Sequence, residues 1–435
     1  MIKAIIIAMT ALAVTSSHAA DSVLTLREAI AIGLENNYDI RIARGNARIA
    51  ENNSGLGTAG FLPTIDATGG YNLNDQQTST TSPFSFGDSR TETRTAQVQL
   101  NWTIFDGLKM FTERARYFEL AKVGQETARL TIENQVLALA QAYFNLVQQK
   151  QRLGANREAL KVSATRLEKE QLRRELGGTS STDYLNAEVF YNNDQAAVIN
   201  QELAVTTARQ SLNLALGRDP ETPVTVPSEI DIPDRDYTID GLMERATERN
   251  AGLAVARHSA KAAEHRMGTT RSRFIPRVWL NAGVGYTNRV QDAEIRDDDI
   301  TTETTDKFIG LQASWNIFNG RRDWIDWQNA RVEENIARLS LSRREQQLKG
   351  EVVERLETFH KRMELVELEF ANQSAAWRNL ELQRDLYATG VVTSLEYRDA
   401  QLNYTRAQLS LITARYQARV ALLQIEQLIA ALPLD

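Results

Sequence analysis

Residues 96–107 read AQVQLNWTIFDG, and residues 309–320 read IGLQASWNIFNG. From 96 to 104, and again from 309 to 317, apolar side chains alternate with polar or small ones, and a tryptophan lies near the end of each stretch. A period of two indicates a β-strand, and strands of about ten residues with one apolar and one polar face are typical of transmembrane β-barrels. The two stretches therefore predict strands with lipid on one face and water on the other.

A second, weaker strand precedes each of these stretches. Residues 61–71 and 274–284 alternate less strictly, and long polar segments, 72–93 and 287–305, follow them. We therefore expect β-hairpins at 61–104 and 274–317, with the polar segments as loops outside the membrane. A soluble β-sandwich also has alternating strands, but it would not embed two hairpins between long helices.

The chain consists of two copies of one unit, displaced by 213 residues without a net insertion or deletion. Short motifs keep this offset through helix, strand and loop: Phe61 and Pro63 match Phe274 and Pro276, and Trp102 matches Trp315. Asn37 likewise matches Asn250. The units predicted are 20–217 and 238–431, followed by a tail at 432–435.

Four strands in one chain are too few for a closed membrane barrel, which needs at least about eight. An open sheet edge in lipid leaves backbone groups unpaired at several kcal/mol each. The chain must therefore join copies of itself through an interface that closes into a ring. Strand counting alone permits two, three or more copies.

The remainder of each unit is predicted to be helical, since proline is absent between Pro83 and Pro220 and between Pro276 and Pro433. We expect long helices at 108–176 and 321–389 and return helices at 183–217 and 396–431. A helix at 238–266 would stack end to end on 183–217, and the proline-rich stretch 218–237 would be an outer connector at mid-height. The charge run 166–175 is interpreted mainly as a solvated face.

The first 19 residues have the features of a secretory signal peptide. Lys3 precedes a mostly apolar run, Ala4 to Val14, and Ser17-His18-Ala19 forms a small-x-small cleavage site. The run is too short for a membrane span, and no later segment has 18 consecutive apolar residues, so strands are the expected way across the membrane. Cysteine is absent and the net charge is −6, which excludes disulfides and argues against nucleic acid as a partner.

The sequence resembles the TolC family of outer-membrane efflux proteins from about Leu24 to Ala431. The resemblance lies in the repeated Trp-x-Ile-Phe-[Asp/Asn]-Gly and Phe-[Leu/Ile]-Pro motifs and in the runs 175–188 and 387–401. It implies an α+β membrane protein: a homotrimer with a twelve-strand β-barrel in outer-membrane lipid, continuous with a twelve-helix periplasmic α-barrel. It also implies a periplasmic adaptor and an inner-membrane transporter of the RND or ABC type as partners.

The resemblance further implies a gate where the two helical hairpins turn. Asp183 and Tyr387 match a hydrogen-bonded pair that holds the tip shut in the family, and Glu396 and Asp399 match positions that can form a carboxylate ring. Two exposed acids at a helix start, favoured by the helix dipole, are the simpler explanation of that pair. The expected hairpin tip and adaptor contacts are Gly177, Gly178, Gly390, Val391 and Val392.

Val392 departs from the family pattern, because the best-known member has an arginine there. The closing contacts should accordingly be weaker or differently built, and Arg398 is a candidate substitute.

Family members are not enzymes, and this sequence has no phosphate loop, nucleophile motif or metal-ligand spacing. We therefore expect no catalysis, no cofactor and no metal. The predicted function is a passive exit duct of a tripartite efflux or type I secretion system. A pump-independent porin is the alternative, and a periplasmic coiled-coil scaffold is opposed by the alternating strands.

Overall fold

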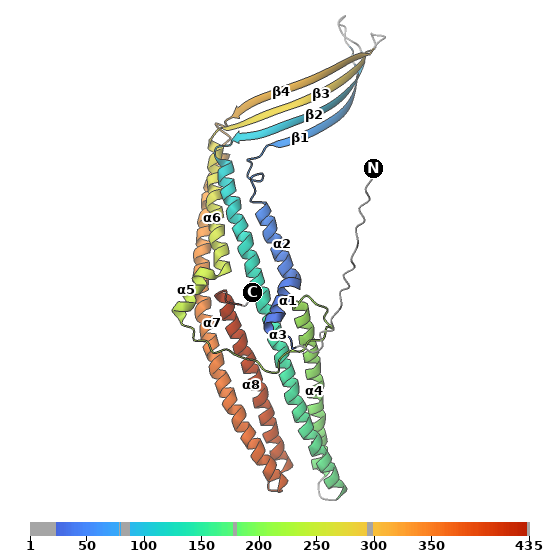
Figure 1. Cartoon of the computed structure of the whole chain (residues 1–435), viewed down its shortest axis with the longest axis vertical. Helices are drawn as coiled ribbons and strands as arrows, with labels where there is room; N and C mark the ends of the chain where they lie inside the picture. Colours follow the sequence, from blue (N-terminus) through green and yellow to red (C-terminus); the bar gives the residue numbers. More distant parts are fainter. Residues whose placement is uncertain (1–22, 78, 80–87, 177–180, 294–298, 433–435) are drawn as a thin grey trace, which may run out of the picture.

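The computed structural model describes residues 23–77, 79, 88–176, 181–293 and 299–432. The molecule is long and thin, with one β-sheet at one end and two helical hairpins at the other (Figure 1). The predicted signal peptide at 1–19 and most of the predicted tail at 432–435 lie outside the described residues.

The sheet has four antiparallel strands in the order β1-β2-β3-β4. They are β1 Thr64–Gln76, β2 Ser89–Phe105, β3 Arg277–Ala293 and β4 Ile300–Ser314. The predicted four strands per chain are thus confirmed, and the two hairpins join through β2 and β3. β1 and β4 are the two edges of the sheet.

The polar segments 72–93 and 287–305 were predicted to be loops, which is wrong for residues 72–76, 89–93, 287–293 and 300–305 because these belong to strands. β1 continues to Gln76 and β2 begins at Ser89. In the second hairpin, β3 continues to Ala293 and β4 begins at Ile300. Threonine-rich stretches suit strands because the side chain is β-branched, and cross-strand polar pairs such as Asn288 Nδ2 to Glu303 Oε1, 3.2 Å, need no apolar alternation. β4 ends at Ser314, earlier than the predicted 317.

The sheet has one polar and one apolar face, in agreement with the predicted alternation. On the polar face, amide side chains form a row in which Gln97 donates to Gln99, Gln99 to Asn101 and Asn101 to Asp66. On the other face, Leu280 pairs with Leu311 and Ala282 with Ile309, and Ile309 is 78% exposed within the single chain. Such exposure of apolar side chains marks a face that lipid can cover.

Eight α-helices are present among the described residues. They are α1 Leu26–Asn36, α2 Tyr38–Asn52, α3 Lys109–Glu175, α4 Ser181–Ala215, α5 Ile239–Arg249, α6 Ala251–Arg271, α7 Arg322–Ala388 and α8 Ser394–Leu428. The long helices α3 and α7 have 67 residues each, and the return helices α4 and α8 have 35 each. In the described part of the chain, we find no helix with the length and hydropathy to cross a membrane.

The helix predicted at 238–266 is interrupted at Asn250, where the backbone is extended (φ −64°, ψ 117°). The Asn250 side chain caps α6 by accepting from Leu253 N, and Asn37 caps α2 in the same way. An asparagine side chain can satisfy the free amides of a new helix, which makes such a break inexpensive.

Hydrogen bonds from the same two asparagines show that the predicted stacking of helix 238–266 on helix 183–217 is wrong. Asn37 Nδ2 donates to Ala215 O at 2.9 Å, and Asn250 Nδ2 donates to Leu428 O at 3.3 Å. The upper helices therefore end on the return helix of their own unit, α2 above α4 and α6 above α8, instead of 238–266 above 183–217. Residues 216–238, which contain no helix or strand, pass sideways between the two stacks (Figure 1).

The motif repeated at 102–107 and 315–320 forms the corner between strand and helix. Trp102 Nε1 donates to Phe61 O at 3.0 Å, and Trp315 Nε1 donates to Phe274 O at 3.2 Å. Gly107 and Gly320 have positive φ, and a Cβ on Gly107 would lie 2.6 Å from Ser272 O. The chain can therefore turn sharply from β2 into α3 only because glycine stands there.

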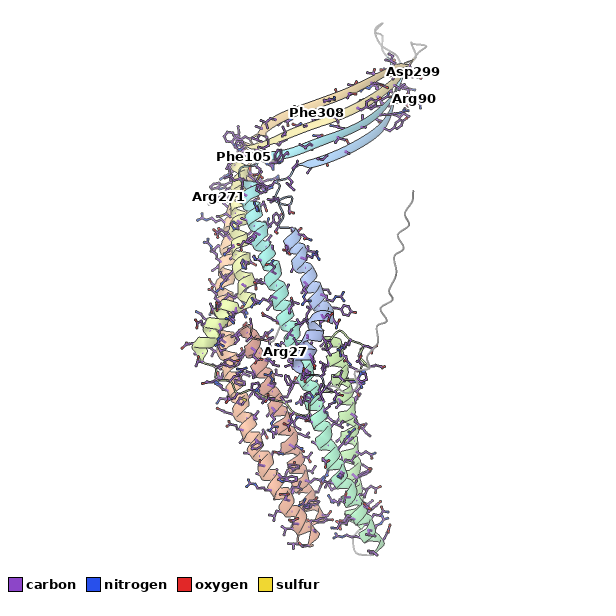
Figure 2. The ribbon with its side chains drawn as sticks, viewed as in Figure 1. Arg27, Arg90, Phe105, Arg271, Asp299 and Phe308 are labelled. Atoms are coloured by element: carbon purple, nitrogen blue, oxygen red, sulfur yellow. The ribbon has the colours of Figure 1, made fainter. Side chains whose placement is uncertain are left out.

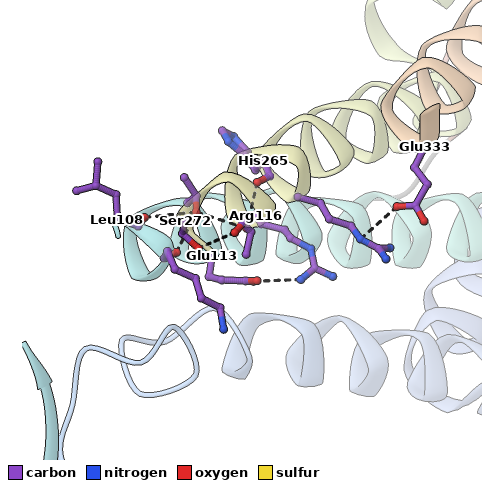
Figure 3. A network of polar contacts seen from close by, with 10 residues as sticks. Leu108, Glu113, Arg116, His265, Ser272 and Glu333 are labelled. Carbon is purple, nitrogen blue, oxygen red and sulfur yellow. Dashed lines mark hydrogen bonds and ion pairs between the residues drawn. The ribbon is translucent and has the colours of Figure 1, made fainter. Parts of the chain in front are cut away.

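Polar contacts within the first turns of α3 stabilise this corner. Asp106 Oδ1 accepts from Met110 N at 3.1 Å. Arg116 donates to Glu113 at 3.0 Å, as Figure 3 shows. Figure 2 shows Phe105 and Arg271 where the sheet meets α3 and α6, and Arg90 and Asp299 at the far end of the sheet. The corner thus sets the angle between sheet and helices.

The helices form a single curved layer. α3 packs against α2, α4, α6 and α8, and α7 packs against α5, α6 and α8. The lateral order is therefore α2 and α4, then α3, then α6 and α8, then α7. The buried core lies where the stacks meet, around Leu146, Leu212 and Leu216 on one side and Leu348, Leu422 and Ile425 on the other.

Candidate functional site

The turn between α7 and α8 holds three of the residues predicted for the hairpin tip. Gly390 has φ 77°, and a Cβ added there would meet nothing within 4 Å. Gly390 N donates to Tyr387 O and Val391 N to Leu386 O, a helix end that favours glycine. Val391 is 70% exposed and Val392 is half-buried. The other two predicted tip residues, Gly177 and Gly178, lie outside the described residues.

Glu396 and Asp399 lie exposed on the first turns of α8. The Glu396 carboxylate accepts from Thr393 N at 2.7 Å and Thr393 Oγ1 at 2.8 Å, which forms a capping box. The hydrogen bond from the Thr393 backbone, followed by that from its hydroxyl, lowers the pKa of Glu396. The carboxylate therefore remains charged at neutral pH while it caps the helix.

Tyr387 does not bond to Asp183, as the resemblance implied, but to Glu170. The Tyr387 hydroxyl donates to Glu170 Oε1 at 2.5 Å, joining α7 to α3. Glu170 is 1% exposed, and Tyr387 is 7% exposed. Burial, and then the bond to Glu170, raises the pKa of Tyr387 to about 12, so the phenol keeps its proton and acts as the donor.

Aromatic and cationic groups surround this bond. The Tyr387 and Tyr397 rings are stacked, with centroids 5.2 Å apart and planes 6° apart. Lys169 Nζ lies 4.4 Å from the Tyr387 ring centroid, and Arg173 lies 3.6 Å from Glu170. The cations compensate the charge that Glu170 carries into the interface.

Arg398 forms a second link, between α8 and α4. Its two terminal nitrogens donate to the two oxygens of Asp194 at 2.7 and 2.8 Å, and its side chain is 3% exposed. The guanidinium also lies 4.9 Å from the Phe190 ring centroid. A bidentate arginine–carboxylate pair is specific in geometry, so it fixes where α8 lies relative to α4.

The interpretation of 166–175 as a solvated face is wrong for two of its charges. Arg166 is 5% exposed and lies 5.3 Å from the Phe190 ring centroid, and Glu170 is also buried. Burial lowers the pKa of Arg166. Positions 166, 170 and 173 share one helix face, and that spacing is the sequence signal that could have singled them out. Asp194 and Phe190 were missed as well, and no motif marks them.

The Tyr387–Glu170 and Arg398–Asp194 contacts join the first hairpin, α3 and α4, to the second hairpin, α7 and α8. Gln401 Nε2 adds a bond from α8 to Ala159 O on α3, 3.1 Å long. We refer to Glu170–Tyr387, Asp194–Arg398 and Ala159–Gln401 as the inter-hairpin contacts. A displacement of the second hairpin relative to the first breaks them together. Among the described residues no group of three or more potential ligands could hold a metal ion.

A family model described as "Outer membrane efflux protein" matches residues 30–218 and 242–431. The chain is 21% identical to "Outer membrane efflux protein BepC" of Brucella suis over 404 residues, which cover 91% of this chain and 83% of the relative. It is 22% identical to "Toluene efflux pump outer membrane protein TtgC" of Pseudomonas putida over 404 residues, 90% of this chain and 79% of the relative.

A similar solved structure is the Campylobacter jejuni CmeC outer membrane channel. Its TM-score is 0.79 at 14% sequence identity, with 96% of this chain and 90% of that chain covered. The likeness shows that the four-stranded sheet and the helical layer of this chain have the fold of that channel.

Proposed function

The chain belongs to the outer membrane efflux protein family, and we propose that three copies form a duct through which a pump exports its substrates. It is an outer-membrane protein that extends into the periplasm, as its relatives do. The family is one of efflux channels and not of enzymes.

The observation that carries the proposal is a two-faced sheet with two unpaired edges, continuous with the helical layer. β1 lies on the side of α2 and α4, and β4 leads into α7 on the other side (Figure 1). One chain therefore presents different edges at its two sides, which suits a head-to-tail ring. Three copies supply twelve strands, and their polar faces line the lumen.

Apolar stripes along both helical edges support this ring. They contain exposed side chains at helical spacing: Leu185, Val189, Ile199, Leu203 and Leu214 on α4, and Val332, Ile336, Leu339, Leu368 and Leu382 on α7. Each is more than half exposed in the single chain. Contiguous apolar stripes are stabilised by a partner surface, and in a ring α4 of one copy faces α7 of the next.

The gate of the duct lies at the tip, where the inter-hairpin contacts hold the second hairpin against the first. In this proposal the Tyr387–Glu170 and Arg398–Asp194 pairs hold the tip closed. They replace the contacts of the family's arginine, because Val392 stands at its position and carries no charge. Opening requires α7 and α8 to leave α3 and α4, which exposes the buried Glu170 and Arg398 to water. Asp183, at the start of α4, belongs to the same tip but is not the partner of Tyr387.

Glu396 and Asp399 are proposed to form the constriction. Three copies would bring six carboxylates together, which favours cations over anions. The capping role of Glu396 is compatible with this, because a capping carboxylate stays ionised and exposed.

The adaptor and the inner-membrane transporter, of the RND or ABC type, are proposed partners. The exposed Val391 and the turn at Gly390 form the end that faces them, and Gly177 and Gly178 are proposed as further adaptor contacts on the basis of the sequence alone. One relative's name includes a toluene efflux pump, so this relative works with a pump.

Deleting the gene tests this function against the porin alternative. Loss of export together with normal passive uptake of small nutrients supports the duct. Normal export with reduced nutrient uptake would instead support a porin that needs no pump. Complementation with the intact gene, beside the same gene carrying Tyr387→Phe, connects the phenotype to the gate.

A further inference from the structure

A small recess lies between the two hairpins, beside the Ala159–Gln401 member of the inter-hairpin contacts. Its volume is about 330 Å³, near the lower end for small-molecule sites, which is about 300 Å³. α3 supplies Ala159 and Val162, α7 supplies Trp377 and Leu380, and α8 supplies Tyr397, Gln401 and Tyr404. Both hairpins therefore contribute walls to it.

Aromatic and aliphatic side chains make much of the lining apolar. The Trp377 and Tyr404 rings lie 5.0 Å apart with their planes at 54°, and Leu380 and Val162 also line the recess. Such walls accommodate a flat apolar body, and indole and phenol rings attract a cation at their faces.

Gln401, which lines this recess, has an unused hydrogen-bond acceptor. The residue is 2% exposed, and its Nε2 donates to Ala159 O at 3.1 Å. Its Oε1 is buried without a hydrogen-bond partner among the described residues. The amide cannot be reversed without placing Oε1 against the Ala159 carbonyl, so the free atom is the acceptor. A buried acceptor without a partner is unfavourable, and a bound donor would remove that cost.

The charges around the recess are unbalanced toward the negative. Glu158 and Glu381 line it, and within the described part of the chain neither carboxylate has an ion-pair partner. Arg384 also lines it but pairs with Asp385, 3.6 Å away. Two carboxylates and one guanidinium leave the lining with a net negative charge, and this charge together with the ring faces favours a cation.

We propose that this recess binds a protonated amine that carries a single apolar, ring-sized body. The body packs between Trp377 and Tyr404, and the ammonium group donates to Gln401 Oε1 and approaches the carboxylates. An anion would meet Glu158 and Glu381 unfavourably, and a neutral hydrocarbon would leave Gln401 Oε1 unpaired.

A second consequence rests on the proposed function. Because the walls come from both hairpins, a bound amine bridges them and favours the closed tip. The recess would then be a site at which a small molecule holds the duct shut.

Binding is measured by isothermal titration of the full-length protein in detergent with tryptamine, which is protonated at neutral pH. 3-Ethylindole keeps the ring without the ammonium group, and indole-3-propionate replaces it with a carboxylate. We expect tryptamine to bind at least about fivefold more tightly than either analogue, corresponding to roughly 1 kcal/mol for one charge contact. No tryptamine binding, or equal binding of the three compounds, would overturn the proposal.

Isosteric variants locate the site. Glu381→Gln and Glu158→Gln should each weaken tryptamine binding by about fivefold while leaving the weak binding of 3-ethylindole unchanged. Glu367→Gln is the matched control, because Glu367 is an exposed carboxylate on α7 that does not line the recess. An equal loss in the control, or no loss in either recess variant, would contradict the assignment.

The effect on the gate is read separately in planar bilayers. Tryptamine should reduce the fraction of open channels in the wild type and have less effect in Glu381→Gln. Tryptamine binding without any change in channel opening would retain the site but contradict its coupling to the gate. Absence of any channel would count against the duct and leave the titration result standing.

Discussion

Replacing Tyr387 with phenylalanine removes one hydroxyl and tests whether the inter-hairpin contacts hold the tip closed. The substitution leaves Glu170, which is 1% exposed, without the donor that now lies 2.5 Å away. A hydrogen bond to a charged group contributes about 1.5–3 kcal/mol. We expect the lower half of that range, because Arg173 remains 3.6 Å from Glu170.

Such a loss shifts the equilibrium between closed and open tips by about tenfold or more per chain. In planar bilayers the variant should therefore open more often than the wild type, and cells that carry it should leak more antibiotic. Tyr397→Phe is the matched control: its ring stacks on Tyr387, but its hydroxyl has no hydrogen bond among the described contacts. Wild-type gating in Tyr387→Phe, or equal opening in both variants, would refute the reasoning.

The same bond predicts a dependence on pH. The Tyr387 pKa is raised to about 12, whereas an unperturbed tyrosine titrates near about 10. A group whose pKa is raised on folding contributes its stabilisation in full below the unfolded pKa and loses it as the pH rises through the folded value. Closure in the wild type should thus persist to about pH 10 and weaken toward pH 12, and Tyr387→Phe should lack this step.

Asp194→Asn breaks the buried Arg398–Asp194 pair and should destabilise the closed tip by about 3–5 kcal/mol, which proteolysis near the tip measures. Arg157→Gln breaks the exposed Arg157–Glu202 pair and, as the control, should cost only about 0–1 kcal/mol. Equal protease sensitivity of the two variants would contradict the role of burial. Glu396→Gln combined with Asp399→Asn should weaken cation selectivity without unfolding α8, because glutamine can keep the capping box; reversal potentials test this, and an unchanged selectivity would reject the ring. Asn250→Ala should lower the free energy of unfolding by about 1–2 kcal/mol, since it removes a helix cap and the bond to Leu428 O; chemical denaturation measures it, and a change near zero would show that the cap is dispensable.

Alternation was sufficient to predict the strands, and the absence of proline was sufficient to predict the long helices. The polar upper parts of the strands were missed because backbone pairing, and not burial, maintains them, as the Asn288–Glu303 pair illustrates. The break at Asn250 was missed although Asn37 occupies the matching position. An asparagine inside a helical pattern does not reveal whether its side chain caps a new helix or points to solvent.

The residues of the proposed gate show the same limit. Tyr387 was identified from its match to a family position, but its partner depends on which face of α3 is turned toward α7. Glu170 on α3 takes the place of Asp183 on α4 as the hydrogen-bond acceptor because of how α3 and α7 pack against each other. The sequence does not specify that packing. The burial of Arg166 and Glu170 inside a run of ten mostly charged residues likewise depends on contact with the second hairpin.

The central claim is that one chain cannot close its sheet and that three copies do. Native mass spectrometry of the full-length protein, extracted from outer membranes in mild detergent, measures this directly. We predict one dominant species with the mass of three mature chains, with no monomer until the detergent denatures the protein. A stable, folded monomer or dimer as the dominant species would contradict the account, because β1 and β4 would then remain unpaired edges in lipid.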